Sequence, residues 1–316
     1  MVETISAIVP TIGRQHSLSR LLDALAAQTR KPDEVVVCDG SEDDSIRALA
    51  DPGRWAARGL PVRYVRVHPP NAVRQRLQAI QVATGSLLLL LDDDVIPEPT
   101  CVAALVDCLM SSNAVAVSAD FSNQQWPAPT TLWRWYLRII HQIAGDEWQG
   151  RVLGPLLRFG YVSSPTEPVP MEWLGSGNSL IRRDAYDRSG GFSDFFLHRS
   201  TVNEDVDLGL KLARQGRLLL CPSARMAHTH APGGRASARV IAEDDLYNRY
   251  VILRRTAKRP RSVAMALIVC YFIIETASSL AASVRQVRGN QFFSRLAGRV
   301  SAIVRIVAFP SWSRTP

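Results

Sequence analysis

The sequence of 316 residues lacks the cysteine patterns that stabilise secreted domains or bind zinc. Its five cysteines are an odd number without a C-x-x-C pair or a Cys–His group of zinc-site spacing: Cys38, Cys101, Cys108, Cys221 and Cys270. A disulfide framework is therefore excluded, and free thiols in a reducing compartment are predicted. The N-terminus also lacks the basic segment and long apolar stretch of a secretory signal, so we do not expect export.

The chain does not have the composition of a disordered protein either. Hydrophobic residues make up 47% of it and charged residues 21%, which is the range of folded globular proteins. The length exceeds that of a typical single domain. We therefore expect one catalytic domain at residues 1–240, with an insertion at about 122–171, and an attached segment at 241–316.

Acidic residues are scarce in the C-terminal part. From Arg254 onward the chain has eleven arginines and lysines and one acid, Glu275, although the whole protein carries a net charge of only +8. Within this basic part, residues 262–284 are almost continuously apolar, which favours a lipid surface over nucleic acid. Because Glu275 lies near the middle, we expect an interfacial or re-entrant helix rather than a spanning one. Residues 292–309 have the pattern of a basic amphipathic helix. Packing of both helices on the catalytic domain is the alternative.

Hydrophobic periodicity in the first half alternates between strands and helices. This order predicts an α/β fold with a mainly parallel central sheet covered by helices on both faces. The five consecutive leucines at 87–91 have the composition of a central strand. The predicted strands are 5–9, 34–38, 62–67, 87–91 and 114–118, and the predicted helices lie near 16–29, 44–57, 71–83 and 98–110.

Polar residues follow these strands where parallel strands end together. Thr11 and Arg14 come after the first strand, Asp39 after the second, and three aspartates, residues 92–94, after the fourth. Ligands bind at this edge of open α/β sheets. The sequence therefore predicts a binding site that gathers these side chains.

The three aspartates at 92–94 are the densest negative charge in the sequence next to an apolar strand. Strand alternation would place Asp92 and Asp94 on the same side, where they could share a Mg²⁺ or Mn²⁺ ion. The alternative is a solvated turn that caps a helix starting near Glu98. Similarly, Asp39 could bind a base or ribose or be an ordinary turn residue, and Arg74 could bind a phosphate or lie on the surface.

A series of short motifs in fixed order resembles the family 2 inverting glycosyltransferases of bacterial polysaccharide synthesis, which have the GT-A fold. The resemblance covers residues 6–239, and each fragment is weak alone. The motifs are IVPTIGR at 8–14, VCDGS at 37–41, LDDDV at 91–95, WLGSGN at 173–178 with RR at 182–183, and NEDVDLGL at 203–210.

The resemblance implies roles for individual residues. Asp39 would bind the nucleotide base, Asp92 and Asp94 would hold the metal, and Asp205 would be the general base. His228 matches a later histidine near the metal and diphosphate, with His230 as the second choice. The predicted donor contacts are Pro10, Thr11, Arg14, Asp39, Arg74, Asp92 and Asp93, and the predicted sugar or acceptor region is Gly175, Gly177, Asn178 and Glu204.

These residue types are suited to transfer of a sugar with inversion at its anomeric carbon. A carboxylate removes the acceptor proton, and a divalent cation stabilises the departing nucleoside diphosphate. Asp205 could equally be an acid favoured at the start of a helix capped by Asn203. Taken alone, His228 could be a core or surface histidine, and the glycines at 175 and 177 could form an ordinary turn.

The predicted function is therefore metal-dependent transfer from a UDP- or dTDP-sugar to a glycan or lipid-linked saccharide. The predicted location is the cytoplasmic side of the cell membrane, with peripheral or monotopic attachment, no nucleic-acid partner, and Mn²⁺ or Mg²⁺ as cofactor. Two alternatives remain at this stage: a nucleotidyltransferase, and a non-catalytic membrane-bound scaffold. The former usually has a glycine-rich phosphate loop, whereas residues 10–14 contain a single glycine.

Overall fold

The computed structural model describes residues 3–163, 165–198, 201–231, 236–286 and 289–308. The chain forms two compact units. Unit 1 consists of Met1–Trp126 and Gly160–Gly234, and unit 2 of Pro127–Phe159 and Arg235–Pro316. Most of the insertion to which the sequence assigned no motif thus belongs with the C-terminal helices.

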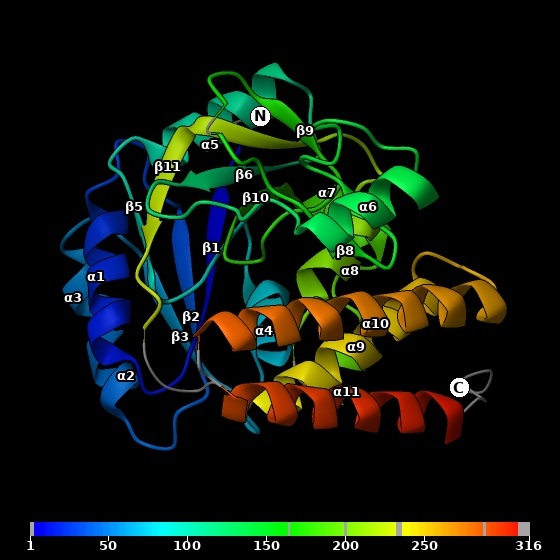
Figure 1. Ribbon diagram of the computed structural model, residues 1–316. Coiled ribbons are helices and arrows are strands. Elements are labelled where there is room, and N and C mark those ends of the chain that lie inside the picture. Colours follow the sequence, from blue (N-terminus) through cyan, green and yellow to red (C-terminus); the bar gives the residue numbers. More distant parts are fainter. Residues whose placement is uncertain (1–2, 164, 199–200, 232–235, 287–288, 309–316) are drawn as a thin grey trace. The chain divides into compact units, whose positions relative to one another are not determined.

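The first half of unit 1 is the alternating α/β arrangement that the periodicity predicts. Its four strands are parallel in the order β3-β2-β1-β4. Helix α1 lies on one face of these strands and α4 on the opposite face (Figure 1). The elements are β1 (Ile5–Thr11), α1 (Gln15–Ala26), β2 (Glu34–Asp39), β3 (Val62–Arg66), α4 (Ala72–Val82) and β4 (Leu87–Leu91).

Burial on both faces of the sheet explains why β4 is a run of leucines. Leu87, Leu89 and Leu91 belong to the core cluster that includes residues of α1, whereas Leu88 and Leu90 are buried outside that cluster. Successive side chains of a strand point to opposite faces, so a strand covered on both faces is apolar at every position. Asp92 is therefore the first residue that leaves the core.

The second half of unit 1 departs from the predicted parallel series. The strand predicted at 114–118 is β6, but it does not pair with β4, because β10 lies antiparallel between them. Strand β11 then runs parallel to β6 and continues to His228. The elements are β5 (Val95–Pro97), α5 (Cys101–Ser111), β6 (Ala116–Phe121), β9 (Val169–Met171), β10 (Asn178–Arg182), α7 (Arg183–Ser189), the 3-10 helix η1 (Asp194–His198), α8 (Glu204–Leu212) and β11 (Leu218–His228).

The helix predicted at 44–57 is two short helices, α2 (Ser45–Leu49) and α3 (Pro52–Ala56). Pro52 has no backbone N–H and cannot continue a helix, but it fits the first turn of a new one. The side chain of Asp51 accepts a hydrogen bond from the Arg54 N–H and caps that new helix. The apolar periodicity is continuous across the break, so periodicity alone missed it.

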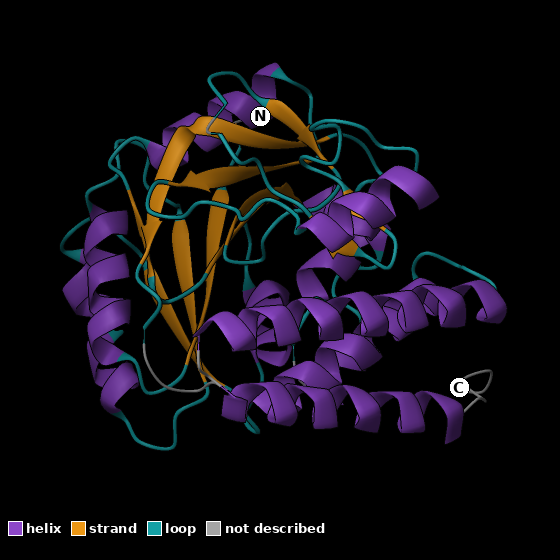
Figure 2. Cartoon of the chain, viewed as in Figure 1, coloured by secondary structure: helices purple, strands orange, loops and turns teal. Residues whose placement is uncertain are grey.

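Unit 2 is mainly helical, with one short pair of strands (Figure 2). The predicted C-terminal helices are present as α10 and α11, and α9 precedes them. Gly298 allows α11 to pack closely on α9, because a Cβ at this position would collide with the carbonyl of Arg239. The elements are α6 (Thr131–Ile140), β7 (Val152–Leu153), β8 (Leu157–Arg158), α9 (Ala238–Arg255), α10 (Arg261–Gln286) and α11 (Gly289–Ala308).

The acid that interrupts the apolar segment of α10 has partners inside unit 2. Arg299 of α11 lies 3.4 Å from a carboxylate oxygen of Glu275, and the Trp133 indole N–H donates to the other oxygen. Among the described residues, α10 contains the one segment long and apolar enough to cross a membrane, Arg261–Val284. Pairing of Glu275 gives this helix a polar inner side and leaves its apolar outer side exposed.

Candidate active site

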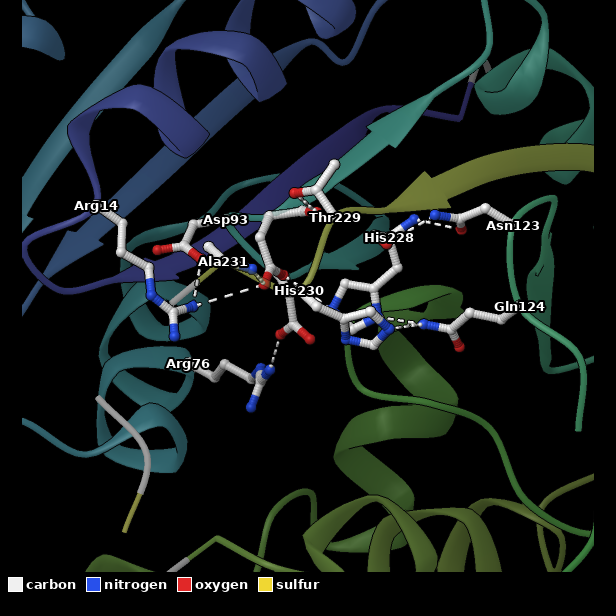
Figure 3. Close-up of polar contacts among 11 residues, drawn as sticks. Arg14, Arg76, Asp93, Asn123, Gln124, His228, Thr229, His230 and Ala231 are labelled. Carbon is white, nitrogen blue, oxygen red and sulfur yellow. Dashed lines mark hydrogen bonds and ion pairs between the residues drawn. The ribbon is translucent and has the colours of Figure 1, made fainter. Parts of the chain in front are cut away.

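The three aspartates lie in a turn directly after β4, and each points to a different partner. Asp92 accepts a hydrogen bond from Arg76 at 2.6 Å, Asp93 accepts one from Thr11 at 2.7 Å, and Asp94 lies 3.0 Å from His228. Arg14 and Arg76 approach the cluster from separate elements (Figure 3). Because residues 92–94 form a turn, the predicted reason for pairing Asp92 with Asp94, strand alternation, is wrong. The aspartates do not cap a helix either, since β5 intervenes and α5 begins at Cys101.

Strand β11 brings its end to the carboxylate of Asp94. The backbone N–H of Ala231 donates to Oδ2 of Asp94 at 2.9 Å, and Nε2 of His228 lies 3.0 Å from Oδ1. Burial raises the pKa of Asp94, but the hydrogen bonds from His228 and Ala231 and the charge of Arg14 outweigh it and lower this pKa below its usual value. Asp94 is therefore held as a carboxylate.

Asp92, Asp94 and His228 form the group of metal-ligand type found among the described residues. One potential ligand atom from each residue lies within 4.8 Å of the others. Two carboxylate oxygens and an imidazole nitrogen suit Mn²⁺ or Mg²⁺, which bind few protein ligands and complete their coordination with substrate phosphates. The residues present fit such an ion, and His230 is outside this group.

Asp93 does not share the position of its two neighbours. Its side chain is buried, and Arg14 donates to it at 3.0 Å in addition to Thr11. Burial raises the pKa of Asp93 to about 6 against the opposing effects of Thr11 and Arg14. Asp93 thus joins the end of β1, where Pro10 and Thr11 lie, to the turn after β4.

An arginine that the sequence did not single out contacts the cluster. Arg76 of α4 is almost completely buried and bridges Asp92 and Glu204, at 2.6 Å and 3.2 Å. The predicted arginine, Arg74, instead donates to the carbonyl of Leu197 at 3.0 Å. Residues two apart on a helix point to different sides. Which of Arg74 and Arg76 faces the aspartates therefore depends on how α4 is rotated against the sheet, and the sequence does not give this rotation.

Helix α8 begins with the two acids predicted for the acceptor side. Glu204 is buried and accepts hydrogen bonds from Ser176 at 2.7 Å and Arg76 at 3.2 Å, whereas Asp205 is half-buried. The predicted capping by Asn203 is wrong, because this residue has a positive φ of 69° and its side chain makes no cap hydrogen bond. At the start of α8, Asp205 therefore follows Glu204, which Arg76 connects to Asp92.

Burial and the charge of Asp205 raise the pKa of Glu204 to about 7, although Arg76 and Ser176 oppose the shift. The folded protein therefore holds this proton more tightly than the unfolded chain does. The contribution of Glu204 to the free energy of unfolding should fall by about 1–3 kcal/mol as the pH rises from about 4.5 to about 7. We expect Glu204→Gln to remove this loss, so that the variant gains stability over the wild type between pH 5 and pH 8.

Urea unfolding at pH 5 and pH 8 without divalent cations measures this difference. Glu42→Gln, at an exposed glutamate of the same unit, is the matched control and should follow the wild type at both pH values. A stability difference between Glu204→Gln and wild type that is the same at both pH values would contradict the predicted titration.

The glycines of the WLGSGN motif permit close packing around the cluster. A Cβ at Gly177 would collide with the carboxylate of Asp92, and one at Gly175 would collide with the side-chain oxygen of Asn178. Asn178 in turn donates to the carbonyl of Ala119 at 2.7 Å. The backbone of this motif thus lies directly beside Asp92, and only glycine fits at these two positions.

Asp39 lies at the end of β2 and is fully buried. Its carboxylate accepts hydrogen bonds from the Tyr64 hydroxyl at 2.9 Å and from the Ser41 N–H at 2.8 Å. The buried amide of Gln75 donates to the carbonyls of Thr11 and Cys38, both at 2.7 Å, and joins the ends of β1 and β2. Tyr64 and Gln75 were not predicted, since neither belongs to a recognisable motif.

The sheet order, with a carboxylate turn at the carboxyl end of a central strand, is that of the GT-A fold. Two solved structures share the fold. The mannosyltransferase PcManGT from Pyrobaculum calidifontis in complex with GDP-Man and Mn²⁺ has a TM-score of 0.58 and 17% identity, covering 100% of this chain and 89% of that one. S. aureus TarS 1–349 in complex with UDP-GlcNAc has a TM-score of 0.57 and 14% identity, covering 95% and 81%.

Residues 6–164 match the family Glycosyl transferase family 2, and the chain belongs to this family. The O-antigen biosynthesis protein RfbC of Myxococcus xanthus is 28% identical over 79% of this chain, a match that spans only 19% of the Myxococcus protein. An N-acetylglucosaminyl-diphospho-decaprenol L-rhamnosyltransferase of Mycobacterium tuberculosis is 24% identical over 73% of this chain and 78% of that protein. The family and fold predicted from the ordered motifs are confirmed.

Proposed function

We propose that the protein transfers a sugar from a nucleotide donor to a glycan or lipid-linked saccharide, with a divalent cation and with inversion. The observation that supports this most directly is the grouping of Asp92, Asp94 and His228 within 4.8 Å at the sheet edge. The start of α8, with Asp205, is linked to the same cluster through Glu204 and Arg76. A donor phosphate and an acceptor hydroxyl can thus meet between groups of suitable chemistry.

In the proposed mechanism, Asp205 accepts the proton of the attacking acceptor hydroxyl. The new bond forms at the anomeric carbon as its bond to the diphosphate breaks, and the electron pair leaves with the diphosphate. A divalent cation held by Asp92, Asp94 and His228 would supply charge stabilisation to that leaving group. Arg14 and Arg76 orient the aspartates through their contacts with Asp93 and Asp92. One displacement by one base inverts the anomeric centre.

The acceptor class rests on the relatives, and the donor class on the sequence. The Mycobacterium protein is named for rhamnosyl transfer to a lipid-linked sugar, and the Myxococcus protein for O-antigen biosynthesis. We therefore propose a lipid-linked saccharide as acceptor. We propose a UDP- or dTDP-sugar as donor, as predicted from the sequence; TarS was solved with UDP-GlcNAc. Asp39 would receive the base, and each of its oxygens, which accept from Tyr64 and Ser41, has a further lone pair for this.

Calorimetric titration of the protein with UDP, dTDP and GDP, each with and without Mn²⁺, tests the donor site. We expect one of the uridine or thymidine nucleotides to bind in a manganese-dependent manner. Anomeric NMR couplings of the sugar product then report inversion or retention. Failure of all three nucleotides to bind would contradict the proposed donor site and favour a non-catalytic scaffold.

We also propose that the protein attaches to the cytoplasmic face of a membrane through its C-terminal helices. Unit 2 contains 18 arginines and lysines against six acids, so it carries +12, and unit 1 carries −4. Helix α11 exposes apolar side chains along one face, where Phe293 is 68% and Val304 61% exposed. An exposed apolar stripe on a basic unit is suited to the surface of an anionic bilayer.

The double substitution Phe293→Ser/Val304→Ser should lower binding to phosphatidylglycerol vesicles about tenfold or more, because two large apolar side chains no longer enter the lipid. Vesicle co-sedimentation measures this. These residues are preferable to deletion of 262–316, since α10 and α11 also bury Ile268 and Ile306, and their loss would damage unit 2. Unchanged vesicle binding would contradict attachment through α11.

A further inference from the structure

Helix α6 has an apolar face that is exposed among the described residues. Four of its ten residues are large, apolar and exposed, and Trp135 is 67% and Ile139 55% exposed. Leu132, Trp135 and Ile139 follow the i, i+3, i+7 spacing of one helical stripe, and Ile140 is adjacent. Such a concentration of exposed apolar side chains on a single helix indicates an interaction surface.

The opposite side of α6 is fixed within unit 2. Trp133 and Tyr136 are buried, and the rings of Trp133 and Tyr271 of α10 lie 5.8 Å apart. Near the start of α6, the hydroxyls of Thr130 and Ser278 lie 3.4 Å apart. The helix therefore cannot turn its apolar stripe inward without breaking these contacts, so within unit 2 the stripe stays open to a partner.

The charge and composition of this surface favour a lipid bilayer over a protein partner. Arg134 and Arg138 are exposed on α6, and the unit as a whole carries +12. Tryptophan prefers the interface between lipid and water, and basic residues bind anionic headgroups. Helix α10, on which α6 packs, also exposes apolar side chains, including Ile273 at 59%.

We propose that α6 is a bilayer-contacting helix that inserts Leu132, Trp135 and Ile139 among the headgroups of an anionic membrane. This inference rests on the membrane attachment proposed above and extends it to a helix far from the C-terminus in sequence. It gives the segment 127–159 a role in bringing the enzyme to a lipid-linked acceptor. The partner chemistry is a bilayer containing anionic lipid.

Fluorescence quenching by brominated lipids tests this directly. Vesicles of phosphatidylethanolamine and phosphatidylglycerol with brominated chains should quench part of the wild-type tryptophan emission, and Trp135→Phe should lose that part while still binding. Trp135→Ser/Ile139→Ser should weaken vesicle binding about tenfold or more. Met110→Ser, at an exposed apolar residue of α5 in unit 1, is the matched control and should bind as the wild type does.

The outcomes separate this inference from the membrane attachment itself. If the wild type does not bind the vesicles, the proposed attachment fails and α6 loses its role with it. If Phe293→Ser/Val304→Ser weakens binding but Trp135→Ser/Ile139→Ser does not, and quenching is equal in wild type and Trp135→Phe, the attachment stands and the role of α6 is overturned.

A second inference concerns Gln124, which follows β6 and lies against both histidines (Figure 3). Its amide nitrogen is 2.8 Å from Nδ1 of His228 and 2.8 Å from Nε2 of His230. Asn123 fixes the backbone of His228 by accepting from its N–H at 2.9 Å and donating to its carbonyl at 2.8 Å. The other ring nitrogen of His228, Nε2, faces Asp94 at 3.0 Å.

The orientation of this amide determines which nitrogen of His228 carries the proton. With the NH₂ group towards Nδ1, the proton is on Nε2 and is donated to Asp94. After rotation of the amide, its oxygen accepts a proton from Nδ1, and Nε2 presents a lone pair to a cation. We infer that Gln124 is a positioning residue that switches His228 between these two tautomers when the proposed cation binds.

Substitutions of opposite hydrogen-bonding character test this role. Gln124→Leu offers no acceptor and should weaken Mn²⁺ binding about tenfold or more. Gln124→Glu offers only acceptors and should bind Mn²⁺ at least as tightly as the wild type. Mn²⁺ affinity is measured by electron paramagnetic resonance, and the His228 tautomer by ¹⁵N NMR with and without Mg²⁺, with the His228 signal assigned from its loss in His228→Gln.

We expect the wild-type His228 proton to move from Nε2 to Nδ1 when Mg²⁺ is added, and this move to be lost in Gln124→Leu. Wild-type Mn²⁺ affinity and an unchanged tautomer response in Gln124→Leu would overturn the role of Gln124 while the proposed cation site stands. If the wild type binds no Mn²⁺, the cation site itself fails.

Discussion

Asp94→Asn should weaken manganese-dependent nucleotide binding by about 100-fold, or about 2.7 kcal/mol. Three groups stabilise the negative charge of Asp94: His228, the Ala231 N–H and Arg14. Asparagine can still accept the hydrogen bond from Ala231, so the connection to the end of β11 is kept while the charge is removed. Calorimetry with the nucleotide that binds the wild type measures the change.

Asp184→Asn is the matched control, since Asp184 is an exposed carboxylate of α7 in the same unit, paired with Arg188. It should bind nucleotide and Mn²⁺ as the wild type does. Manganese-dependent binding by Asp94→Asn at wild-type affinity would exclude Asp94 from the cation site and require another acid to supply the charge.

Asp205→Asn should lower the rate of sugar transfer about 10²- to 10⁴-fold and leave nucleotide binding unchanged, because only the acceptor proton loses its base. Asp205 lies at the start of α8, and its Oδ1 accepts a hydrogen bond from the Val206 N–H. This contact orients the carboxylate. Steady-state kinetics with the acceptor, together with nucleotide titration, separates kcat from binding.

The same Asp184→Asn variant serves as the control for Asp205 and should transfer sugar at the wild-type rate. If Asp205→Asn were fully active while Glu204→Gln was not, the general base would be Glu204, which has the raised pKa and the hydrogen bond from Ser176. Loss of nucleotide binding in Asp205→Asn would instead indicate a structural role at the start of α8.

Most of the residues at the carboxyl ends of the first four strands could be predicted from the sequence. Strands β1, β2 and β4 end close to where their apolar runs end, and parallel neighbours end together, so Thr11, Asp39 and the aspartates after β4 were placed correctly at one edge. The long-range contact between Thr11 and Asp93 follows from this arrangement. Local periodicity predicts such features because parallel strands buried on both faces leave little choice of register.

Contacts made by later elements could not be read in this way. Strand β10 is antiparallel and lies between β4 and β6, although its residues come far later in the chain. Arg76 and Gln124 have no motif, and their importance comes from the carboxylate and the histidines that they meet in space. Their types and spacing resemble those of ordinary surface residues.

The sequence by itself determined the alternating order of strands and helices, the acidic edge and the uneven distribution of charge, because these depend on local periodicity and composition. Only the tertiary structure decided which residues meet Asp92 and Asp94. It brought His228 to them through an extended β11, placed Arg76 rather than Arg74 at the cluster, and turned Trp135 outward on α6. Those outcomes depend on helix register and on pairing between distant strands, where many alternatives have similar local energies.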